Sequence, residues 1–371
     1  MNIVLVGSAG RCGIYEYSHT LMEGFRALGH RVRYMGVRRH DNRDLARHVR
    51  QVEHGDGLVI FEYEPGIFWL GGLVRAMAWV RFWRHKRVFL SVHEIAPEKY
   101  PEFRQIQWHL TRPVSLCGWL EVIKSVLSTV DVALRFLMLR VGWLLMGWLP
   151  HIVLVHSSRA VENIHLILPD DRKVRYTPLV VKQLEGDRDV LRQELGLPIG
   201  YFAFIIPGFL FRRKRIIEVI EQLPPNAELW VVGTESEYDP GYLAEIQAHL
   251  SKSAHRERVR LIHDYERMEQ YLLAADAAVF YYADGYQSAA ASLAVGAGKP
   301  CIFSDLPAFA DLHEAGLVVH TPKELRQAMV QVQDLTLYSD LRERALRLRD
   351  GLRPHRIAAQ YLSESAYADN S

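Results

Sequence analysis

The sequence predicts an α/β protein with two Rossmann-like domains, each built on a doubly wound parallel sheet, that face each other across a cleft. Two observations predict this fold. Short apolar runs that end near a glycine alternate with helical stretches, and the pattern occurs in both halves of the chain. A continuous apolar run is typical of a strand that is buried on both faces of a parallel sheet. The length of 371 residues agrees with two domains.

The composition is that of a globular protein and excludes several classes. Hydrophobic residues make up 49% and charged residues 24% of the chain, which excludes a disordered chain, a collagen and a coiled-coil rod. The formal net charge is +2, so no nucleic-acid partner is expected. The cysteines Cys12, Cys117 and Cys301 are too scattered for a zinc cluster or a disulfide framework, which indicates a reducing compartment. The apolar N-terminus lacks a preceding basic region and is interpreted as a strand, not a signal peptide.

The first half begins with a strand, a glycine loop, a helix and a second strand. The apolar run 3–6 leads into Gly7, Gly10 and Gly13, and a helical stretch follows. Such a loop lets a phosphate approach the backbone at a helix N-terminus. The spacing lacks the middle glycine of a dinucleotide fingerprint, and no Walker lysine follows, which disfavours a dehydrogenase or a P-loop protein. The alternative is that these glycines only form a tight turn.

The second half repeats the alternation. Apolar runs at 202–206, 229–233, 258–262, 276–281 and 301–303 alternate with helical stretches at 216–223, 268–275 and 288–298. A proline-containing hinge at 176–180 separates the halves. We therefore expect an N-terminal domain at 1–178, a C-terminal domain at 179–352 and a helix at 353–371 that returns to the N-terminal domain. Ligands of such sheets bind at the carboxyl ends of the strands.

The order and spacing of the motifs resemble the retaining glycosyltransferases of family 4, which have the GT-B fold. The resemblance rests on the first glycine loop and on residues 28–32, 91–94, 155–157, 208–214, 230–233, 284–286 and 296–300. It implies that the C-terminal domain binds a nucleoside diphosphate sugar and that the N-terminal domain binds the acceptor. It also implies transfer of a hexose with retention of configuration, without a metal or another cofactor.

The resemblance also assigns the site residues. Lys214 matches the lysine that neutralises the donor pyrophosphate. Phe209 occupies the position of a partner arginine, for which Arg212 or Arg213 could substitute. Asp284 and His93 are expected to flank the transferred sugar, and Ser292 replaces a glutamate that holds the ribose. The other donor-binding residues are expected to be Gly233, Gly285, Tyr286, Gln287 and Ser288, and the acceptor loop is expected to contain Gly10, Arg11, Cys12 and Gly13.

An apolar, tryptophan-rich stretch at about 67–149 goes beyond the resemblance. It holds seven of the eight tryptophans, Trp69, Trp79, Trp83, Trp108, Trp119, Trp143 and Trp148, and basic residues lie among them. Tryptophan and arginine suit a membrane interface. The stretch predicts a peripheral protein on the inner, cytoplasmic face of the cell membrane, with a lipid-linked or saccharide acceptor in cell-surface polysaccharide or glycolipid synthesis. The alternative is that these helices pack on the sheet or form a homodimer interface.

Two further functions remain open at this point. Phe209 and Ser292 replace charged residues of the family, which favours a catalytically inactive sugar-nucleotide-binding scaffold or partner subunit. An active transferase releases nucleoside diphosphate in the presence of acceptor, whereas a scaffold only binds the donor. A sugar-nucleotide epimerase on the same fold is the third alternative, and the tryptophan-rich stretch argues against it.

Overall fold

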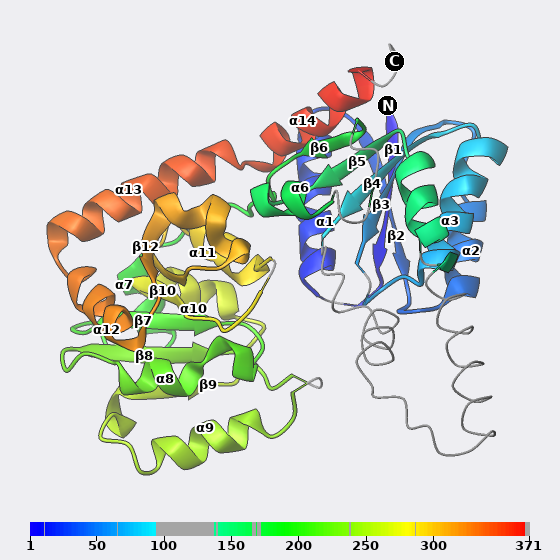
Figure 1. The fold of residues 1–371 in the computed structure, drawn as a ribbon. Coiled ribbons are helices and arrows are strands. Elements are labelled where there is room, and N and C mark those ends of the chain that lie inside the picture. The colour runs from blue at the N-terminus through cyan, green and yellow to red at the C-terminus, as the bar shows by residue number, and fades with distance from the viewer. Residues whose placement is uncertain are drawn as a thin grey trace, which may run out of the picture. The chain divides into compact units, whose positions relative to one another are not determined.

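The structure is a computed structural model that describes residues 1–371 except 11, 65, 94–136, 139, 165–167, 169–171, 237–238, 286 and 368–371. It divides into two compact units, one formed by Met1–Thr177 with Ala358–Ser371 and the other by Pro178–Ile357. Each unit contains a six-stranded sheet whose pairings are all parallel (Figure 1). The predicted fold class is confirmed: both halves are doubly wound α/β units.

The first unit has the strand order β2-β1-β3-β4-β5-β6. Helix α1 covers one face of this sheet, and α2 and α3 cover the other (Figure 1), because the connections reverse direction at β1. The strands are β1 (Asn2–Ser8), β2 (Arg31–Val37), β3 (Asp56–Tyr63), β4 (Arg87–Val92), β5 (Ile152–Val155) and β6 (Val174–Tyr176). The helices include α1 (Gly13–Ala27), α2 (Asn42–Arg50), α3 (Leu70–Ala78), the π-helix η1 (Trp79–Trp83) and α6 (Ser158–Ile164). Residues 140–148 are helical as well, and α14 (Pro354–Tyr367) belongs to this unit from Ala358 onward.

Apolar runs form the central strands of this unit, as the sequence predicts. Residues 3–6 of β1 are fully buried, and so are residues 58–61 of β3. Helix α2 begins at Asp41, whose side chain accepts hydrogen bonds from the backbone N–H groups of Arg43 and Asp44. Helix α1 is followed by Gly29 at φ +81°, the left-handed conformation that ends many helices.

The second unit has the strand order β12-β11-β10-β7-β8-β9. Helices α8 and α9 cover one face and α10 and α11 the other (Figure 1). The strands are β7 (Phe202–Pro207), β8 (Ala227–Val232), β9 (Val259–Ile262), β10 (Ala277–Phe280), β11 (Cys301–Ser304) and β12 (Gly316–Val319). The helices are α7 (Arg188–Glu194), η3 (Arg212–Lys214), α8 (Ile216–Glu221), α9 (Tyr242–Leu250), η4 (Arg256–Arg258), α10 (Met268–Ala274), α11 (Ala289–Gly296), η5 (Pro307–Ala315), α12 (Pro322–Gln331) and α13 (Leu335–Gly351).

A buried ion pair fastens α7 to the amino edge of the second sheet. Arg192 is fully buried and donates to the Asp276 carboxylate at 2.8 Å and to the carbonyl oxygen of Ala274 at 2.8 Å. The same carboxylate accepts the backbone N–H of Ala203 at 2.7 Å. A buried guanidinium or backbone N–H group needs a hydrogen-bond acceptor, because it can no longer bind water. Asp276 is therefore explained by packing and lies at the opposite edge from the strand ends that bind ligands.

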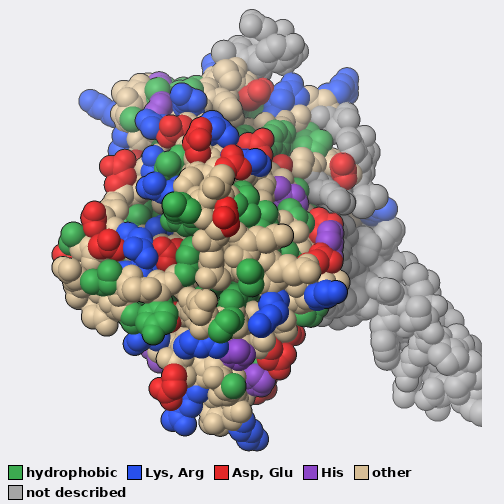
Figure 2. Space-filling model, turned by 90° about the vertical axis from the view of Figure 1, so that its left-hand side faces the viewer, with side chains coloured by type: hydrophobic (Ala, Val, Ile, Leu, Met, Phe, Trp, Pro, Cys, Tyr) green, Lys and Arg blue, Asp and Glu red, His purple; other side chains and the backbone are tan. Residues whose placement is uncertain are grey.

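The surface has mixed charge over the face that Figure 2 shows, where basic and acidic side chains alternate with small hydrophobic patches. This mixture agrees with the net charge of +2. Within the described part of the chain, no helix is both long and apolar enough to cross a membrane.

Candidate functional site

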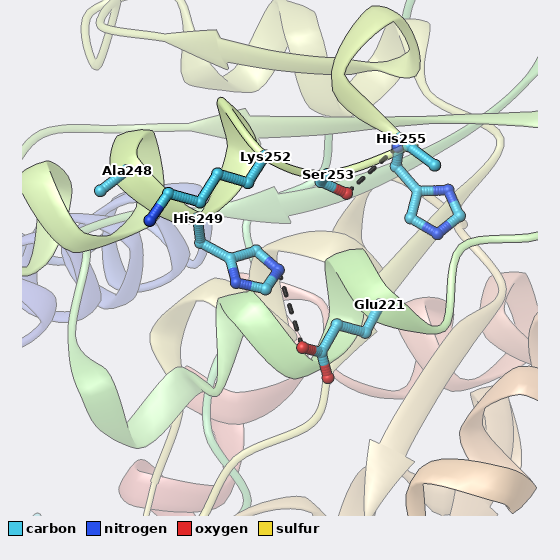
Figure 3. Close-up of a pocket in the computed structure, with 7 residues that line it drawn as sticks. Glu221, Ala248, His249, Lys252, Ser253 and His255 are labelled. Carbon is cyan, nitrogen blue, oxygen red and sulfur yellow. Dashed lines mark hydrogen bonds and ion pairs between the residues drawn. The ribbon is translucent and has the colours of Figure 1, made fainter.

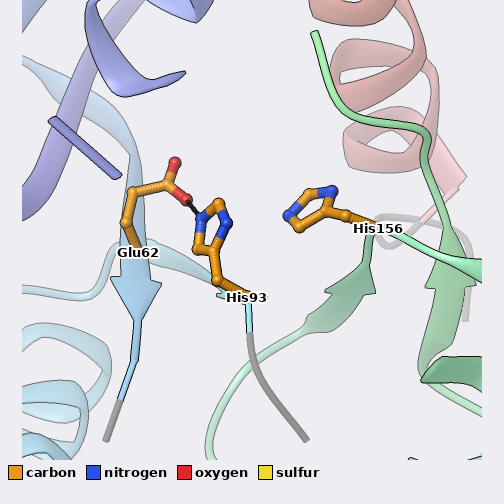
Figure 4. A group of neighbouring side chains, drawn as sticks. All are labelled: Glu62, His93 and His156. Carbon is orange, nitrogen blue, oxygen red and sulfur yellow. Dashed lines mark hydrogen bonds and ion pairs between the residues drawn. The ribbon is translucent and has the colours of Figure 1, made fainter. Parts of the chain in front are cut away.

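Four polar side chains gather at the carboxyl ends of three adjacent strands in the first unit. Glu62 comes from β3, Ser91 from β4, His93 from the residue after β4 and His156 from the residue after β5. All four are buried, with exposed fractions of 0%, 0%, 7% and 2%. Figure 4 shows Glu62 joined to His93, with the ring of His156 facing them from the neighbouring strand. The structure thus places His93 at a strand's carboxyl end, as the sequence predicts.

One hydroxyl group joins these side chains into a network. Ser91 Oγ lies 2.8 Å from His156 Nε2 and 3.2 Å from His93 Nε2, and it also contacts the Glu62 carboxylate. His93 Nε2 lies 2.7 Å from Glu62 Oε2. The other oxygen, Glu62 Oε1, is buried and has no hydrogen-bond partner among the described residues. A buried carboxylate with so few donors requires a nearby proton or positive charge.

The protonation of His156 follows from its partners. Its Nδ1 lies 2.8 Å from the carbonyl oxygen of Thr177, which can only accept, so Nδ1 carries the proton. Burial, reinforced by the neighbouring His93, lowers the pKa of His156 well below its ordinary value. His156 is therefore neutral at physiological pH, and the lone pair of its Nε2 faces Ser91 Oγ.

The same residues have the composition of a metal site, and their geometry explains why they do not need one. One ligand atom from each of Glu62, His93 and His156 lies within 4.8 Å of the others, and two histidines with a carboxylate suit zinc or iron. The hydroxyl of Ser91, however, lies in hydrogen-bond contact with all three and occupies the space between them. A cation would first have to displace that side chain, so the set fits a hydrogen-bonded network better than a metal centre.

Two tyrosines extend the network on the side of α1 and α14. Tyr17 and Tyr361 are 7% and 0% exposed, and their hydroxyl oxygens lie 2.7 Å apart. The ring of Tyr17 packs edge-on against His93, with ring centres 4.8 Å apart. Burial raises the pKa of Tyr17 and of Tyr361 well above the ordinary value, and the charge of Glu62 adds to both shifts. Both hydroxyls consequently remain protonated, and one of them donates to the other.

The glycine loop of the first unit lies at the carboxyl end of β1. Cys12 is the residue before α1 and makes no capping hydrogen bond through its side chain, and Gly13 is the first residue of the helix. Gly10 follows β1, and its carbonyl oxygen accepts from Ser8 Oγ at 3.1 Å. The predicted residue Arg11 lies outside the described residues. The loop has the predicted place at a strand end and a helix N-terminus.

In the second unit, Lys214 lies at the carboxyl end of β7, in the short turn η3. It is 5% exposed, and its Nζ donates to the carbonyl oxygen of Pro207 at 2.7 Å. Burial, with a smaller effect from the charge of Arg213, lowers the pKa of Lys214 to about 7. Among the described residues no carboxylate forms an ion pair with this ammonium group. An anion that arrived here would meet a cation without a competing partner.

Two glycines bring the backbone of this edge close together. A side chain at Gly233, whose φ is +155°, would place its Cβ 2.2 Å from the carbonyl oxygen of Gly208. Gly208 itself has φ +91°, and a Cβ there would lie 3.3 Å from Lys214 Nζ. The loops after β7 and β8 can therefore approach each other this closely only because Gly208 and Gly233 have no side chains. Gly233 shapes the loop that surrounds the lysine.

The two predicted arginines differ in their partners. Arg212 forms ion pairs with Asp239 and Glu245, so acidic side chains already occupy its guanidinium. Arg213 has a side chain that is 38% exposed and lies 3.9 Å from Asp284, whose side chain is 66% exposed. This weak contact leaves Arg213 the more available cation for a ligand. The sequence alone gives no reason to prefer either arginine as a ligand of the donor, whereas the structure shows that their ion-pair partners differ.

The loop after β10 leads into α11 and contains most of the other predicted donor residues. Ser288 is the N-cap of α11, and its hydroxyl accepts the backbone N–H of Ala291 at 3.3 Å. Ser292 is 6% exposed, and within the described residues its hydroxyl has no hydrogen-bond partner. The side-chain nitrogen of Gln287 is likewise buried without a described partner. Gly285 is buried in this loop, and Tyr286 lies outside the described residues.

An aromatic pair includes a residue of the loop after β7, the loop that leads to Lys214. Phe209 follows Gly208 and is 37% exposed. Its ring stacks on Tyr265, with centres 5.1 Å apart and planes inclined by 25°. This pair gives the loop after β7 a flat apolar surface, and such surfaces favour planar ligands.

The sequence interpretation missed Glu62, Tyr17 and Tyr361 as parts of the site and gave His156 no role. Of these residues, Glu62 has a signal in its own sequence neighbourhood, because it is an acidic residue near the end of the apolar strand β3. A carboxylate that is buried at a strand end requires a partner, and this requirement could have marked it. Its partners Ser91 and His93 belong to β4 and to the residue after it. That β4 lies next to β3 follows from the order of the strands in the sheet, which the sequence does not give.

Exposed aromatic and apolar side chains remain in the described part of the tryptophan-rich stretch. Arg81 lies over the rings of Phe82 and Trp148, at 5.7 Å from each ring centre. Trp83 is 71% exposed and stacks on Trp79. Trp143 is buried in the core. The stretch therefore has a packed side and an exposed side. Residues 94–136, with Trp108 and Trp119, lie outside the described residues.

A shallow hollow in the second unit lies away from these groups. It is lined by Glu221, Ala248, His249, Lys252, Ser253, Ala254 and His255 (Figure 3). His249 Nε2 lies 3.7 Å from the Glu221 carboxylate. The hollow lies at the C-terminal ends of α8 and α9, which in a parallel sheet face the amino ends of the strands. It is therefore at the wrong edge for the ligand of such a sheet.

Comparison with known proteins agrees with this geometry. Residues 207–334 match the family model described as Glycosyl transferases group 1. No curated protein matches the sequence. HepE from Anabaena, solved in complex with UDP, has a TM-score of 0.71 at 14% identity, over 99% of this chain and 100% of that chain.

Two further solved structures are similar over nearly their whole length. Sucrose-phosphate synthase from Thermosynechococcus elongatus has a TM-score of 0.63 at 15% identity, over 100% of both chains. WaaG, a glycosyltransferase involved in lipopolysaccharide biosynthesis, has a TM-score of 0.58 at 16% identity, over 97% of this chain and 98% of that chain. At these identities the likeness shows the fold. The protein has the GT-B glycosyltransferase fold, and its residues 207–334 match the group 1 glycosyltransferases.

Proposed function

We propose that the protein is a retaining glycosyltransferase that moves a hexose from a nucleoside diphosphate sugar to a hydroxyl group of an acceptor. The observation that carries this proposal is Lys214, a buried lysine at the carboxyl edge of the second sheet with no carboxylate paired to it among the described residues. It lies inside the segment that matches group 1 glycosyltransferases. A departing nucleoside diphosphate gains negative charge, and a buried cation stabilises that charge strongly.

The donor site that we propose is built on three loops of the second unit. Lys214 and Arg213 bind the diphosphate, and Gly233 lets the backbone approach it. Phe209 and Tyr265 offer their flat surface to the nucleobase. The similar structure of HepE, whose complexes contain UDP and UDP-glucose, supports this class of donor. Since two side-chain cations face the diphosphate, we propose a reaction that needs no metal.

The chemistry assigns different tasks to the two units. In the second unit, Lys214 takes up a proton when the diphosphate binds, because an anion at hydrogen-bond distance favours the charged form. In retention, the acceptor hydroxyl attacks on the face from which the diphosphate leaves, and the departing phosphate accepts the hydroxyl proton. We propose Asp284 as a ligand of the donor sugar, and His93 with the loop at 10–13 as the part of the first unit that serves the acceptor.

The acceptor that we propose is lipid-linked or a saccharide in cell-surface polysaccharide or glycolipid synthesis. On the first unit, Trp148 is 57% exposed and lies under the guanidinium of Arg81, and Trp83 is 71% exposed and stacks on Trp79. Indole rings prefer the headgroup level of a bilayer, and guanidinium groups attract anionic lipid. We propose peripheral attachment to the cytoplasmic face of the membrane through this surface.

The test begins with a thermal-shift panel of nucleoside diphosphates and nucleotide sugars without added metal. We expect one base to stabilise the protein selectively. Lys214→Ala should abolish this shift, whereas the control Lys252→Ala, in an exposed lysine at the other edge of the sheet, should keep it. Release of nucleoside diphosphate in the presence of lipid-linked acceptors then measures transfer. A normal shift in Lys214→Ala would contradict the assigned role.

A second function, an inactive donor-binding subunit, is favoured by Phe209 and Ser292. Neither supplies the charge that the family resemblance expects at its position. For this alternative we expect donor binding without release of nucleoside diphosphate, whichever acceptor is offered. Turnover with any acceptor excludes it.

A further inference from the structure

Glu62 is an acidic residue in a strand that otherwise belongs to the core. The apolar residues 58–61 that precede it are fully buried, and Glu62 itself is 0% exposed. Moving a carboxylate out of water is costly, and a well-packed apolar side chain is often at least as stabilising in such a place. The contacts of Glu62 therefore have to explain why an acid occupies this position.

The register of the sheet directs Glu62 towards His93. Glu62 lies opposite Ser91 in the parallel pairing of β3 with β4. Because side chains alternate along a strand, Ser91 and His93 face the same side of the sheet as Glu62. The backbone N–H of His93 donates to the carbonyl oxygen of Tyr63 at 3.0 Å, which fixes the main chain beside the ring. Strand pairing thus brings the carboxylate and the imidazole together.

Packing alone does not decide how the His93 ring is turned. The ring packs against those of Tyr17 and His156, whose centres are each 4.8 Å away. A half-turn about the Cβ–Cγ bond exchanges ring nitrogens for ring carbons of nearly the same size, so these contacts would hardly change. A polar partner is needed to distinguish the two orientations.

Glu62 supplies that partner. His93 Nε2 lies 2.7 Å from Glu62 Oε2, a contact that Figure 4 shows, and since a carboxylate can only accept, Nε2 donates. Ser91 Oγ also donates to this oxygen, and it lies farther from His93 Nε2, at 3.2 Å. Hydrogen bonds to a charged acceptor are about twice as strong as neutral ones. Both contacts of the ring with described polar groups use Nε2, so Nδ1 is the ring atom left for a ligand.

We propose that Glu62 is a positioning residue for His93: it turns the ring so that Nε2 faces the buried carboxylate and Nδ1 is presented to the substrate. The effect on reaction rate rests on the proposed function, in which His93 serves the acceptor. The orientation of the ring does not depend on that function. Glu62 is fully buried and acts only through His93.

The direct test is proton–nitrogen NMR of the histidine side chains in the full-length protein. In the wild type we expect a proton on His93 Nε2 that exchanges slowly with water and has the downfield shift of a bond to a carboxylate, and His93→Gln assigns it by its loss. In Glu62→Gln, which keeps the shape and removes the charge, this signal should move upfield and exchange faster. Ser91→Ala should keep the signal, because the 2.7 Å contact with Glu62 remains.

Glu228 provides a matched control that separates this effect from general destabilisation. It lies in β8 of the second unit and is 4% exposed. Its carboxylate accepts hydrogen bonds from Trp230 Nε1 at 3.0 Å and from Arg260 Nε at 3.2 Å. Glu228→Gln removes the charge of a buried carboxylate, as Glu62→Gln does. We expect the His93 signal to be unchanged in this variant, even where its stability falls by as much as that of Glu62→Gln.

Kinetics provide the second readout. We expect kcat to fall about ten- to hundredfold in Glu62→Gln, the effect of losing a hydrogen bond to a charged group, while KM for the donor stays unchanged. In Glu228→Gln, kcat should stay near that of the wild type. If Glu62→Gln fails to fold, Glu62→Asp keeps the charge but withdraws the carboxylate by one CH₂ group, and the same change of the His93 signal is expected.

Two results would overturn the proposal. One is a His93 signal with wild-type properties in folded Glu62→Gln, or in folded Glu62→Asp where that variant replaces it. The other is a wild-type protein without a slowly exchanging proton on His93 Nε2, which needs no variant at Glu62. An absence of turnover in the wild-type protein would instead count against the proposed function, because the NMR result is independent of turnover.

Discussion

Replacing Lys214 by methionine should stabilise the protein and at the same time abolish donor binding. The side chain is 5% exposed, and its pKa falls from the ordinary 10.5 to about 7. Above pH 7 the folded protein therefore holds a neutral lysine where the unfolded chain holds a charged one. Methionine fills a similar volume and carries no charge, so folding no longer has to remove a proton.

The size of the effect follows from the shift. A difference of about 3.5 pKa units corresponds to about 5 kcal/mol at about 1.36 kcal/mol per unit. The lost hydrogen bond to Pro207 offsets about 1 kcal/mol, and imperfect packing of methionine offsets about 1 more. We expect the free energy of unfolding to rise by about 3 kcal/mol at pH 7.

The pH dependence has a definite sign. Between pH 7 and 10.5 the unfolded chain binds the lysine proton and the folded protein does not, so the stability of the wild type rises with pH in this window. The variant lacks this contribution. Before the two offsets, its advantage should fall from about 5 kcal/mol at pH 7 to about 2 kcal/mol at pH 9, and after them it should nearly vanish.

The assay is denaturant unfolding at pH 7 and pH 9, with donor binding measured by calorimetry. Lys299 is a matched control, because it is 8% exposed, its pKa is also lowered to about 7 by burial, and it precedes β11 at the amino edge of the sheet. Lys299→Met should stabilise the protein in the same pH window and leave donor binding intact. A variant at Lys214 that is no more stable than the wild type at pH 7, or whose advantage does not change with pH, would refute the reasoning.

Three further predictions use other parts of the structure. Gly233→Ala should lower the free energy of unfolding by about 2 to 4 kcal/mol and prevent donor binding, because its Cβ would lie 2.2 Å from a backbone carbonyl oxygen; calorimetric unfolding and binding measure both. Arg213→Ala should weaken donor binding about tenfold and Arg212→Ala much less, because two acidic side chains already hold Arg212; equal losses would contradict this order. Trp83→Ser should reduce co-sedimentation with anionic vesicles about tenfold, as buried indole area is lost, whereas Leu335→Ser, at 77% exposure in the second unit, should not.

The sequence could predict most elements of the fold because the physics of a buried parallel strand is local. The run 3–6 is apolar throughout and is followed by a glycine, which distinguishes it from an amphipathic strand with one wet face. In the structure it lies inside β1, Asn2–Ser8. The same argument predicts the run 202–206, which lies inside β7, Phe202–Pro207. Strand β12, Gly316–Val319, also contains an apolar run, at 317–319, but the sequence analysis did not identify it.

Site residues could be predicted from the sequence where their position follows from the end of a single strand. Contacts between residues on neighbouring strands could not be predicted. His93 and Lys214 each follow an apolar run, so their places at the carboxyl edges were predictable. The contact of Glu62 with His93 requires β3 to pair with β4, and the contact of Ser91 with His156 requires β4 to pair with β5. A single sequence contains no signal for those pairings. The different partners of Arg212 and Arg213 were hidden for the same reason.

The division of the first unit into two chain segments affects how the protein is synthesised. Tyr17 and Phe25 emerge from the ribosome early, but the tyrosine that covers them belongs to the segment after Ala358. All of the second unit, residues 178–357, is made in between, which takes about 10 to 40 seconds at ordinary translation rates. During that time one face of α1 stays uncovered. The second unit can therefore finish folding before the first, and a chain that is released before residue 361 would keep an incomplete, aggregation-prone first unit.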